Sequence, residues 1–144
     1  SKIGVESTIL SLIDKPTLLR YGGLEIKKIK KILKRKILNK INSKNKISPG
    51  MLPLHYSPGI PLRINVKKSK KNEAFLLIKK RKNNFKNFYY LSKEKNLEEA
   101  AKNLYSTLRK IKKDGFHKIA VEKIPNKDLG KTINDRLKRA SKYK

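Results

Sequence analysis

The first forty residues alternate between short extended segments and one helical segment. The strand-like stretch Gly4–Leu10 is followed by an Asp-Lys-Pro turn and a second extended run, Thr17–Arg20, which stops at Gly22-Gly23. Between Leu24 and Leu38 apolar residues recur every three or four positions, with lysines in between. This spacing predicts a helix with one apolar stripe.

A polar stretch, Asn39–Lys46, then leads into an uncharged, proline-rich one, Ser48–Pro61. The second stretch holds four of the six prolines and no charged residue, although charged residues make up 35% of the chain. Proline fixes φ and removes a hydrogen-bond donor, so this segment is neither a regular helix nor a central strand. A free linker in such a protein should be rich in lysine. We therefore expect the segment to pack against another part of the protein.

Beyond Pro61 the pattern predicts a small α/β layer domain. Its longer helix has Asn96 as its N-cap, with Glu99 in the capping-box position. A second helix has apolar residues at the spacing of one helical face. The predicted strands are Leu62–Val66, Ala74–Ile78, Phe88–Leu91 and His117–Glu122, and the apolar residues of the last helix are Leu129, Ile133, Leu137 and Ala140.

Length and composition restrict the class of protein. A chain of 144 residues has room for one ordinary domain, or for a small domain and part of another. Without cysteine, disulfides, Cys-ligated zinc and thiol catalysis are excluded, and two histidines do not suggest a histidine-rich metal site. No apolar run approaches the roughly 20 residues of a membrane-spanning helix, and Ser1–Val5 does not resemble a secretory signal. We expect a cytoplasmic protein.

The formal net charge of +28 has two interpretations. It could mark an RNA-binding surface. However, only seven of the 39 basic residues are arginine, the residue whose planar fork suits phosphate and base recognition. The lysines are spread along the whole chain together with many Ile and Asn residues, all of which have A/T-rich codons. A skewed genome composition therefore explains the charge better than a selected RNA-binding surface does, and the charge is weak evidence for RNA binding.

Few residues suggest catalysis on their own. The chain has no HExxH, no Gly-Lys-Ser/Thr phosphate loop and no GxSxG motif. The remaining candidates are the hydroxyl of Ser7 in a strand-like segment, Arg20 beside two glycines, and Tyr56 in the uncharged loop. An arginine at that place could hold a phosphate, and a tyrosine could stack on a base. Without further information an ordinary structural role is the favoured interpretation of Ser7 and Arg20, whereas packing and binding explain Tyr56 equally well.

The order of four motifs adds information. The chain reads Gly4-Val-Glu-Ser-Thr-Ile9, then Leu18-Leu-Arg-Tyr-Gly-Gly23, then Ser48-Pro-Gly-Met51 with His55-Tyr56-Ser-Pro58, and finally Ile133-Asn-Asp-Arg-Leu137. In this order and spacing it resembles the two-domain L-threonylcarbamoyladenylate synthases. The resemblance covers essentially the whole chain.

The resemblance implies an α/β fold in three parts. Residues 1–42 would be the truncated C-terminal end of a YrdC-like catalytic domain. Residues 43–61 would be a Pro-rich linker that closes over the active site. Residues 62–144 would form a small, Rossmann-like, three-layer domain. The bulk of the YrdC-like domain, with its basic cluster and Ser-x-Asn segment, would lie upstream of Ser1. The remaining piece should therefore expose apolar edges, and this polypeptide alone should be inactive.

The same resemblance implies synthesis of threonylcarbamoyl-adenylate from L-threonine, bicarbonate and ATP, with release of pyrophosphate. By motif matching, Ser7 would bind L-threonine, whereas Arg20 and Tyr56 would contact ATP. ATP is a substrate, and Mg²⁺ could accompany it, although no protein ligands are identifiable. A threonylcarbamoyl transferase complex would pass the product to tRNA, and no membrane is involved. The alternative function is a basic RNA-binding or ribosome-associated module.

Some positions depart from the family pattern or remain open. Tyr21 replaces the usual proline after Arg20, and Leu52-Pro53-Leu54 replaces a more polar stretch before His55. In the last helix, Asn134, Asp135 and Arg136 could be site residues, or could tie the helix to the sheet through ion pairs. The catalytic residues cannot be assigned from the sequence.

Overall fold

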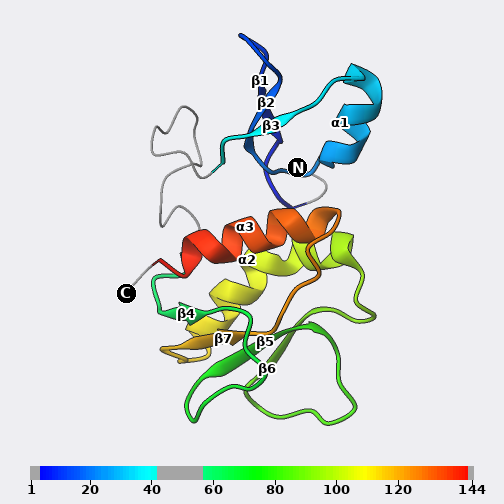
Figure 1. Cartoon of the computed structure of the whole chain (residues 1–144). Coiled ribbons are helices and arrows are strands. Elements are labelled where there is room, and N and C mark those ends of the chain that lie inside the picture. The colour runs from blue at the N-terminus through cyan, green and yellow to red at the C-terminus, as the bar shows by residue number, and fades with distance from the viewer. Residues whose placement is uncertain (1–3, 42–56, 143–144) are drawn as a thin grey trace.

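The computed structural model describes residues 4–41 and 57–142, and these residues contain two sheets (Figure 1). In the small N-terminal sheet the strand order is β1-β2-β3. The first two strands are antiparallel, whereas β3 joins β2 in parallel after the helix α1. The elements are β1 (Ile9–Ser11), β2 (Thr17–Arg20), α1 (Ile26–Leu33) and β3 (Leu38–Asn39).

The second sheet has four strands in the order β4-β7-β5-β6, and all its neighbouring strands are parallel. Two helices, α2 and α3, lie between this sheet and the small N-terminal one (Figure 1). The elements are β4 (Leu62–Arg63), β5 (Ala74–Lys79), β6 (Phe88–Ser92), α2 (Leu97–Lys113), β7 (Ile119–Val121) and α3 (Leu129–Ala140).

The core of the molecule lies between the four-stranded sheet and its two helices. Alternate residues of the central strands, such as Leu76 and Val121, point to this side and are fully buried. They meet Leu104 of α2 and Ile133 of α3, which are also fully buried. Alternation along each strand and helical spacing on α2 and α3 thus bury one continuous apolar layer.

The opposite face of this sheet differs from the three-layer arrangement expected from the sequence. In the described residues, its cluster contains Phe75 and Leu77 with Phe88 and Tyr90 packed against them, and no helix residue. The guanidinium of Arg81 lies 5.5 Å from the Phe75 ring centroid. Because aromatic side chains and this arginine cover the face, the described part of the sheet carries helices on one side only.

Most elements lie where the sequence predicts them, but two N-terminal boundaries shift. The first strand begins at Ile9 and not at Gly4, where the backbone bends with a φ of +71°. The helix α1 ends at Leu33, since Lys34 adopts a left-handed conformation with a φ of 48°. Leu38, which we expected at the end of the helix, pairs instead with Thr17 in the small sheet.

The N-terminal part buries little of its own apolar surface. Helix α1 has no buried residue, and its Ile32 is 81% exposed. Among the described residues, five of the six large hydrophobic side chains that are exposed lie between positions 12 and 38: Leu12, Ile13, Leu24, Ile32 and Leu38. The apolar exposure expected for this segment is therefore present.

Candidate functional site

Two of the three candidate binding residues contact each other in the structure. Arg20, at the end of β2, is buried and donates from Nε and Nη2 to the backbone carbonyl of Ser7, at 3.1 Å and 3.0 Å. Ser7 itself is exposed. The fork of the guanidinium therefore fixes the backbone of the Ser7 segment and places a positive charge beside it. Tyr56, the third candidate, lies outside the described residues.

Glycine at position 22 allows this close packing. A Cβ atom there would lie 2.2 Å from both the Ser7 carbonyl carbon and the Thr8 nitrogen, so no other residue fits without movement of the backbone. The next residue, Gly23, donates its N–H to the Glu6 carbonyl at 2.8 Å. The Gly-Gly pair that ends the second extended run thus packs against the backbone of the segment that carries Ser7.

The last helix holds the same segment from the other side. The side chain of Arg136 is 1% exposed and donates from Nη2 to Glu6 Oε2 and to the Tyr21 carbonyl, each at 2.9 Å. Thr132 of the same helix donates its hydroxyl to the Gly22 carbonyl at 2.9 Å. These contacts join residues 110 to 130 positions apart, so α3 fixes the backbone on both sides of the Arg20–Ser7 contact.

Asp135 completes this ionic group. Its carboxylate accepts from Arg136 Nη1 at 2.6 Å and from Arg139 Nε at 3.1 Å. Burial, together with the charge of Asp135, raises the pKa of the neighbouring Tyr21 phenol. Buried charges are tolerated when each has hydrogen-bonding partners, and the arginines here share one carboxylate and backbone acceptors.

The two interpretations of the last-helix motif can now be compared. Asp135 and Arg136 do form ion pairs, as the structural interpretation required. However, Arg136 reaches the segment that carries Ser7 and Arg20, and not the four-stranded sheet. Asn134 donates to the Ile124 carbonyl at 3.2 Å and so braces the loop before α3.

Sequence reasoning missed Glu6 and Thr132. Glu6 stood inside a quoted motif without a role, and its partner lies 130 residues away. An acidic residue within a short apolar segment was the only signal that could have drawn attention to it. Thr132 gave no signal, because a threonine in a helix has many uses.

Two further structural findings concern the class of protein. Within the described ranges, no group of three or more His, Asp or Glu side chains could hold a metal ion. None of the helices in the part that the structure describes has the length and hydropathy needed to cross a membrane.

Comparisons with known proteins agree on one family. The sequence model of the threonylcarbamoyl-AMP synthase C-terminal domain matches residues 24–142. Threonylcarbamoyl-AMP synthase from Pyrococcus abyssi is 30% identical over 164 residues, which covers 100% of this chain and 48% of the relative. The enzyme of the same name from Bacillus subtilis is 30% identical over 158 residues, with coverages of 96% and 46%. The chain thus spans about half the length of the curated relatives it matches.

Solved structures give the same result. The crystal structure of Pyrococcus abyssi Sua5 complexed with L-threonine matches with a TM-score of 0.79 and 29% identity, over 99% of this chain and 47% of that one. A structure of a Pyrococcus abyssi Sua5 variant, in which a histidine and the following tyrosine are replaced by alanine, matches with a TM-score of 0.78 and 26% identity, over 99% of this chain and 46% of that one. These matches confirm the predicted α/β fold class with a parallel sheet. The chain belongs to the threonylcarbamoyl-AMP synthase C-terminal domain family.

Proposed function

We propose that this chain supplies the C-terminal part of a threonylcarbamoyl-AMP synthase. The reaction would convert L-threonine, bicarbonate and ATP into threonylcarbamoyl-adenylate and pyrophosphate. Family membership supports the proposal, as does the likeness of 99% of this chain to a protein crystallised with L-threonine. In this scheme residues 1–42 complete a catalytic domain, residues 43–61 form a lid, and residues 62–144 hold the catalytic domain in place.

Within this scheme Ser7 binds L-threonine and Arg20 binds ATP phosphates. The observation that carries the assignment is the contact between these residues, because it places an exposed hydroxyl-bearing residue beside a guanidinium. Positioning and charge stabilisation are what such a site must supply when two anionic substrates react. Mg²⁺ would accompany the nucleotide, and the product would pass to a tRNA-modifying threonylcarbamoyl transferase complex.

Tyr56 is assigned to ATP as part of the lid. The chain contains a single His-Tyr pair, His55-Tyr56, and it lies in the uncharged, proline-rich stretch. A structure of a Pyrococcus abyssi Sua5 variant changed at a histidine and the following tyrosine has been solved, which makes this pair a natural target for mutation. An apolar lid would exclude water from an activated carbamate that otherwise hydrolyses.

A chimeric enzyme tests the proposal. We would replace the matching part of the Pyrococcus abyssi enzyme by this chain and measure pyrophosphate release. Activity should require ATP, L-threonine and bicarbonate together. It should fall at least tenfold in Arg20→Gln, Ser7→Ala and Tyr56→Phe, but not in Arg109→Gln, which removes an exposed charge on α2. A folded chimera without activity, or one whose activity is unchanged in Arg20→Gln, would contradict the proposal.

This chain on its own should release no pyrophosphate from the three substrates. The alternative function predicts something different: binding of single-stranded RNA without ATP or threonine, with an affinity that falls steeply as salt rises. Tight, salt-sensitive RNA binding by the chain, combined with an inactive chimera, would favour the alternative.

A further inference from the structure

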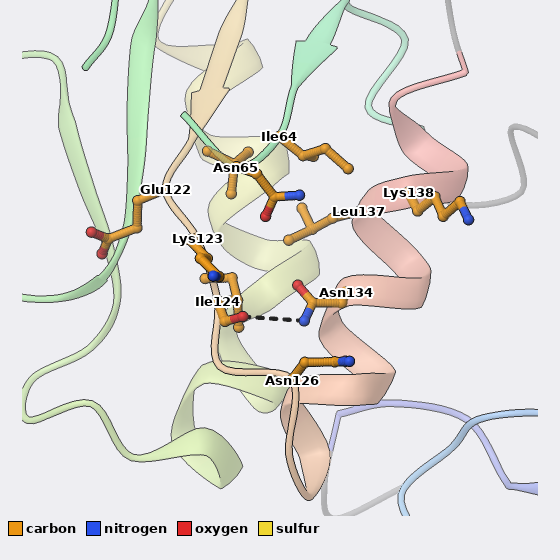
Figure 2. A pocket seen from close by; sticks show the side chains of 10 residues that line it. Ile64, Asn65, Glu122, Lys123, Ile124, Asn126, Asn134, Leu137 and Lys138 are labelled. Carbon is orange, nitrogen blue, oxygen red and sulfur yellow. Dashed lines mark hydrogen bonds between the residues drawn. The ribbon is translucent and has the colours of Figure 1, made fainter. Parts of the chain in front are cut away.

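A hollow of about 540 Å³ lies beside α3, which contributes Asn134, Leu137 and Lys138 to its lining (Figure 2). It opens at the carboxyl ends of the parallel strands β4 and β7. The apolar part of its lining comes from Ile64, Val121, Ile124 and Leu137. Ser7 and Arg20, the two proposed binding residues that the structure describes, do not line it.

The path of the chain explains why a hollow forms here. After β4 the chain passes to the far face of the sheet, where Val66 packs in the aromatic cluster. After β7 it passes to the helix-covered face, where Ile124 joins the main core. In parallel α/β sheets, ligands bind outside the carboxyl ends of strands at the point where the outgoing connections separate. Leu137 and its neighbours on α3 close the third side.

Three asparagine side chains, Asn65, Asn126 and Asn134, line this hollow. Asn134 uses its Nδ2 to donate to the Ile124 carbonyl, and its amide and that of Asn65 point toward one another across the hollow (Figure 2). Neither Asn65 nor Asn126 makes a side-chain hydrogen bond within the described residues, although both line the hollow. Three amides therefore surround one space, and most of their donors and acceptors remain available.

The charge at the hollow is positive. Lys123 and Lys138 are both in its lining and form no ion pair in the part of the chain that the structure describes, but the Lys138 side chain extends outward from α3, away from the hollow (Figure 2). Glu122 is the one acidic residue of the described lining, but it points away (Figure 2). Its carboxylate is neutralised by Arg81 at 2.9 Å and accepts the N–H of Ile78. The uncompensated charge therefore favours an anion.

We propose that this hollow binds a small organic anion of mononucleotide size. Lys123 takes its phosphate, and the three asparagine amides hydrogen-bond a polar, planar body that lies on Leu137 and Ile64. The volume falls within the range of roughly 300 to 1,000 Å³ that is typical of small-molecule sites. This site does not depend on the synthase reaction, and it gives the C-terminal part of the chain a ligand of its own.

An NMR titration of the full chain with AMP tests the proposal. AMP should cause saturable amide shifts at Asn65 and in the loop 122–126, whereas adenosine and inorganic phosphate should each bind at least tenfold more weakly. Lys123→Gln and Asn126→Ala should weaken AMP binding at least tenfold. Both residues are exposed, so these variants leave the core intact. Lys71→Gln removes the same charge from an exposed loop and should change nothing.

Several results would overturn it. Shifts that stay linear with AMP concentration would mean no site. Shifts confined to the Ser7 and Arg20 segment would place AMP elsewhere, and Arg20→Gln separates the two locations because it should leave the shifts in the loop 122–126 intact. If Lys71→Gln and Lys123→Gln weakened AMP binding equally, the overall charge of the chain, and not this hollow, would explain the binding.

Discussion

Arg136 is the side chain on which the link between the N- and C-terminal parts depends most. It is one of the largest side chains with less than 2% exposure, and its guanidinium contacts Glu6, Asp135 and a backbone carbonyl. A buried ion pair contributes little net stability compared with apolar residues, but removing one partner leaves a charge without compensation in a poorly solvated place. The effect of mutation should therefore be large.

We expect Arg136→Gln to lower the free energy of unfolding by about 3 to 5 kcal/mol, because Glu6 and Asp135 lose their shared cation. Urea denaturation followed by circular dichroism would measure this. Arg109→Gln, an exposed arginine on α2, should stay within about 0.5 kcal/mol of the unmodified chain. If both variants unfolded at the same midpoint concentration of urea, the ionic group would not hold the N- and C-terminal parts together.

The residue scale also shows where sequence reasoning stops. The acidic and basic neighbours Asp135 and Arg136 predict ion pairing, and the structure contains it. Their spacing cannot identify Glu6 as the other partner, because that choice depends on how α3 lies against a segment at the far end of the chain. The same holds for Gly22, whose tight environment consists of the backbone of Ser7 and Thr8.

Among the elements, the two longest predicted helices agree with the structure to different degrees. For α2 the apolar spacing and the cap residue both match the structure, and Asn96 Oδ1 accepts from the N–H groups of Glu98 and Glu99. For α1 the apolar stripe continues past Leu33, but the helix does not. Pairing of Leu38 with β2, through its N–H to the Pro16 carbonyl at 2.8 Å, replaces the last turns. Tertiary pairing has overridden the local pattern.

The cap of α2 differs from the predicted capping box in one detail. The carboxylate of Glu99 does not return to the Asn96 N–H, which instead donates to the hydroxyl of Ser92 at 2.8 Å. Glu99 accepts from Ser92 Oγ at 2.6 Å and from the Lys93 N–H at 3.2 Å. The hydrogen bond from Ser92 lowers the pKa of Glu99. Helix α2 thus begins in a network that includes the end of β6.

Asn96→Ala should lower the free energy of unfolding by about 1 kcal/mol, since two backbone N–H groups lose their acceptor. Asn96→Asp keeps an acceptor oxygen at the same place and should remain close to the original stability. Thermal unfolding of the three proteins side by side would measure both effects. A loss of equal size in the two variants would show that the packing of the side chain, and not its hydrogen bonds, matters at this position.

For the whole molecule, the sequence predicted the composition of the layers better than their arrangement. Strand and helix alternation was enough to predict the parallel α/β unit. It could not predict that both helices would lie on one face, because the covering of the other face by Phe88 and Tyr90 depends on strand order. Similarly, the apolar residues between positions 12 and 38 predicted a helix and strands. They did not predict how much of their own surface would remain exposed.

The excess of positive charge makes the few carboxylates important for the whole fold. Within the described residues, seven of the eleven acidic residues take part in ion pairs: Glu6, Glu25, Glu73, Asp114, Glu122, Asp128 and Asp135. Each compensates for part of a formal net charge of +28, which repels itself in a compact molecule. Protonating these groups both removes the ion pairs and increases the net charge. Acid should therefore be the condition to which the fold is most sensitive.

Glu73 allows this to be tested at one buried position. Its carboxylate accepts two hydrogen bonds from Arg63, at 3.0 Å and 2.7 Å, and the Arg63 guanidinium lowers the pKa of Glu73 from its ordinary value of 4.5. Between these two pKa values the unfolded chain binds more protons than the folded one, so stability is lost as the pH falls. The contribution of Glu73 is complete above the ordinary value and disappears as the pH passes down through the lowered one.

In urea titrations between pH 7 and pH 3, Glu73→Gln should therefore be less stable than the unmodified chain at pH 7, and the gap should narrow steadily below about pH 4.5. Glu94→Gln, at an exposed residue without an ion pair in the described part, should show a small gap that does not change with pH. If the stability difference between Glu73→Gln and the unmodified chain kept its full size at pH 3, the shape of the side chain, and not its charge, would explain the effect of the substitution. A narrowing gap would instead identify a buried carboxylate as one cause of acid sensitivity in a protein with so few acidic residues.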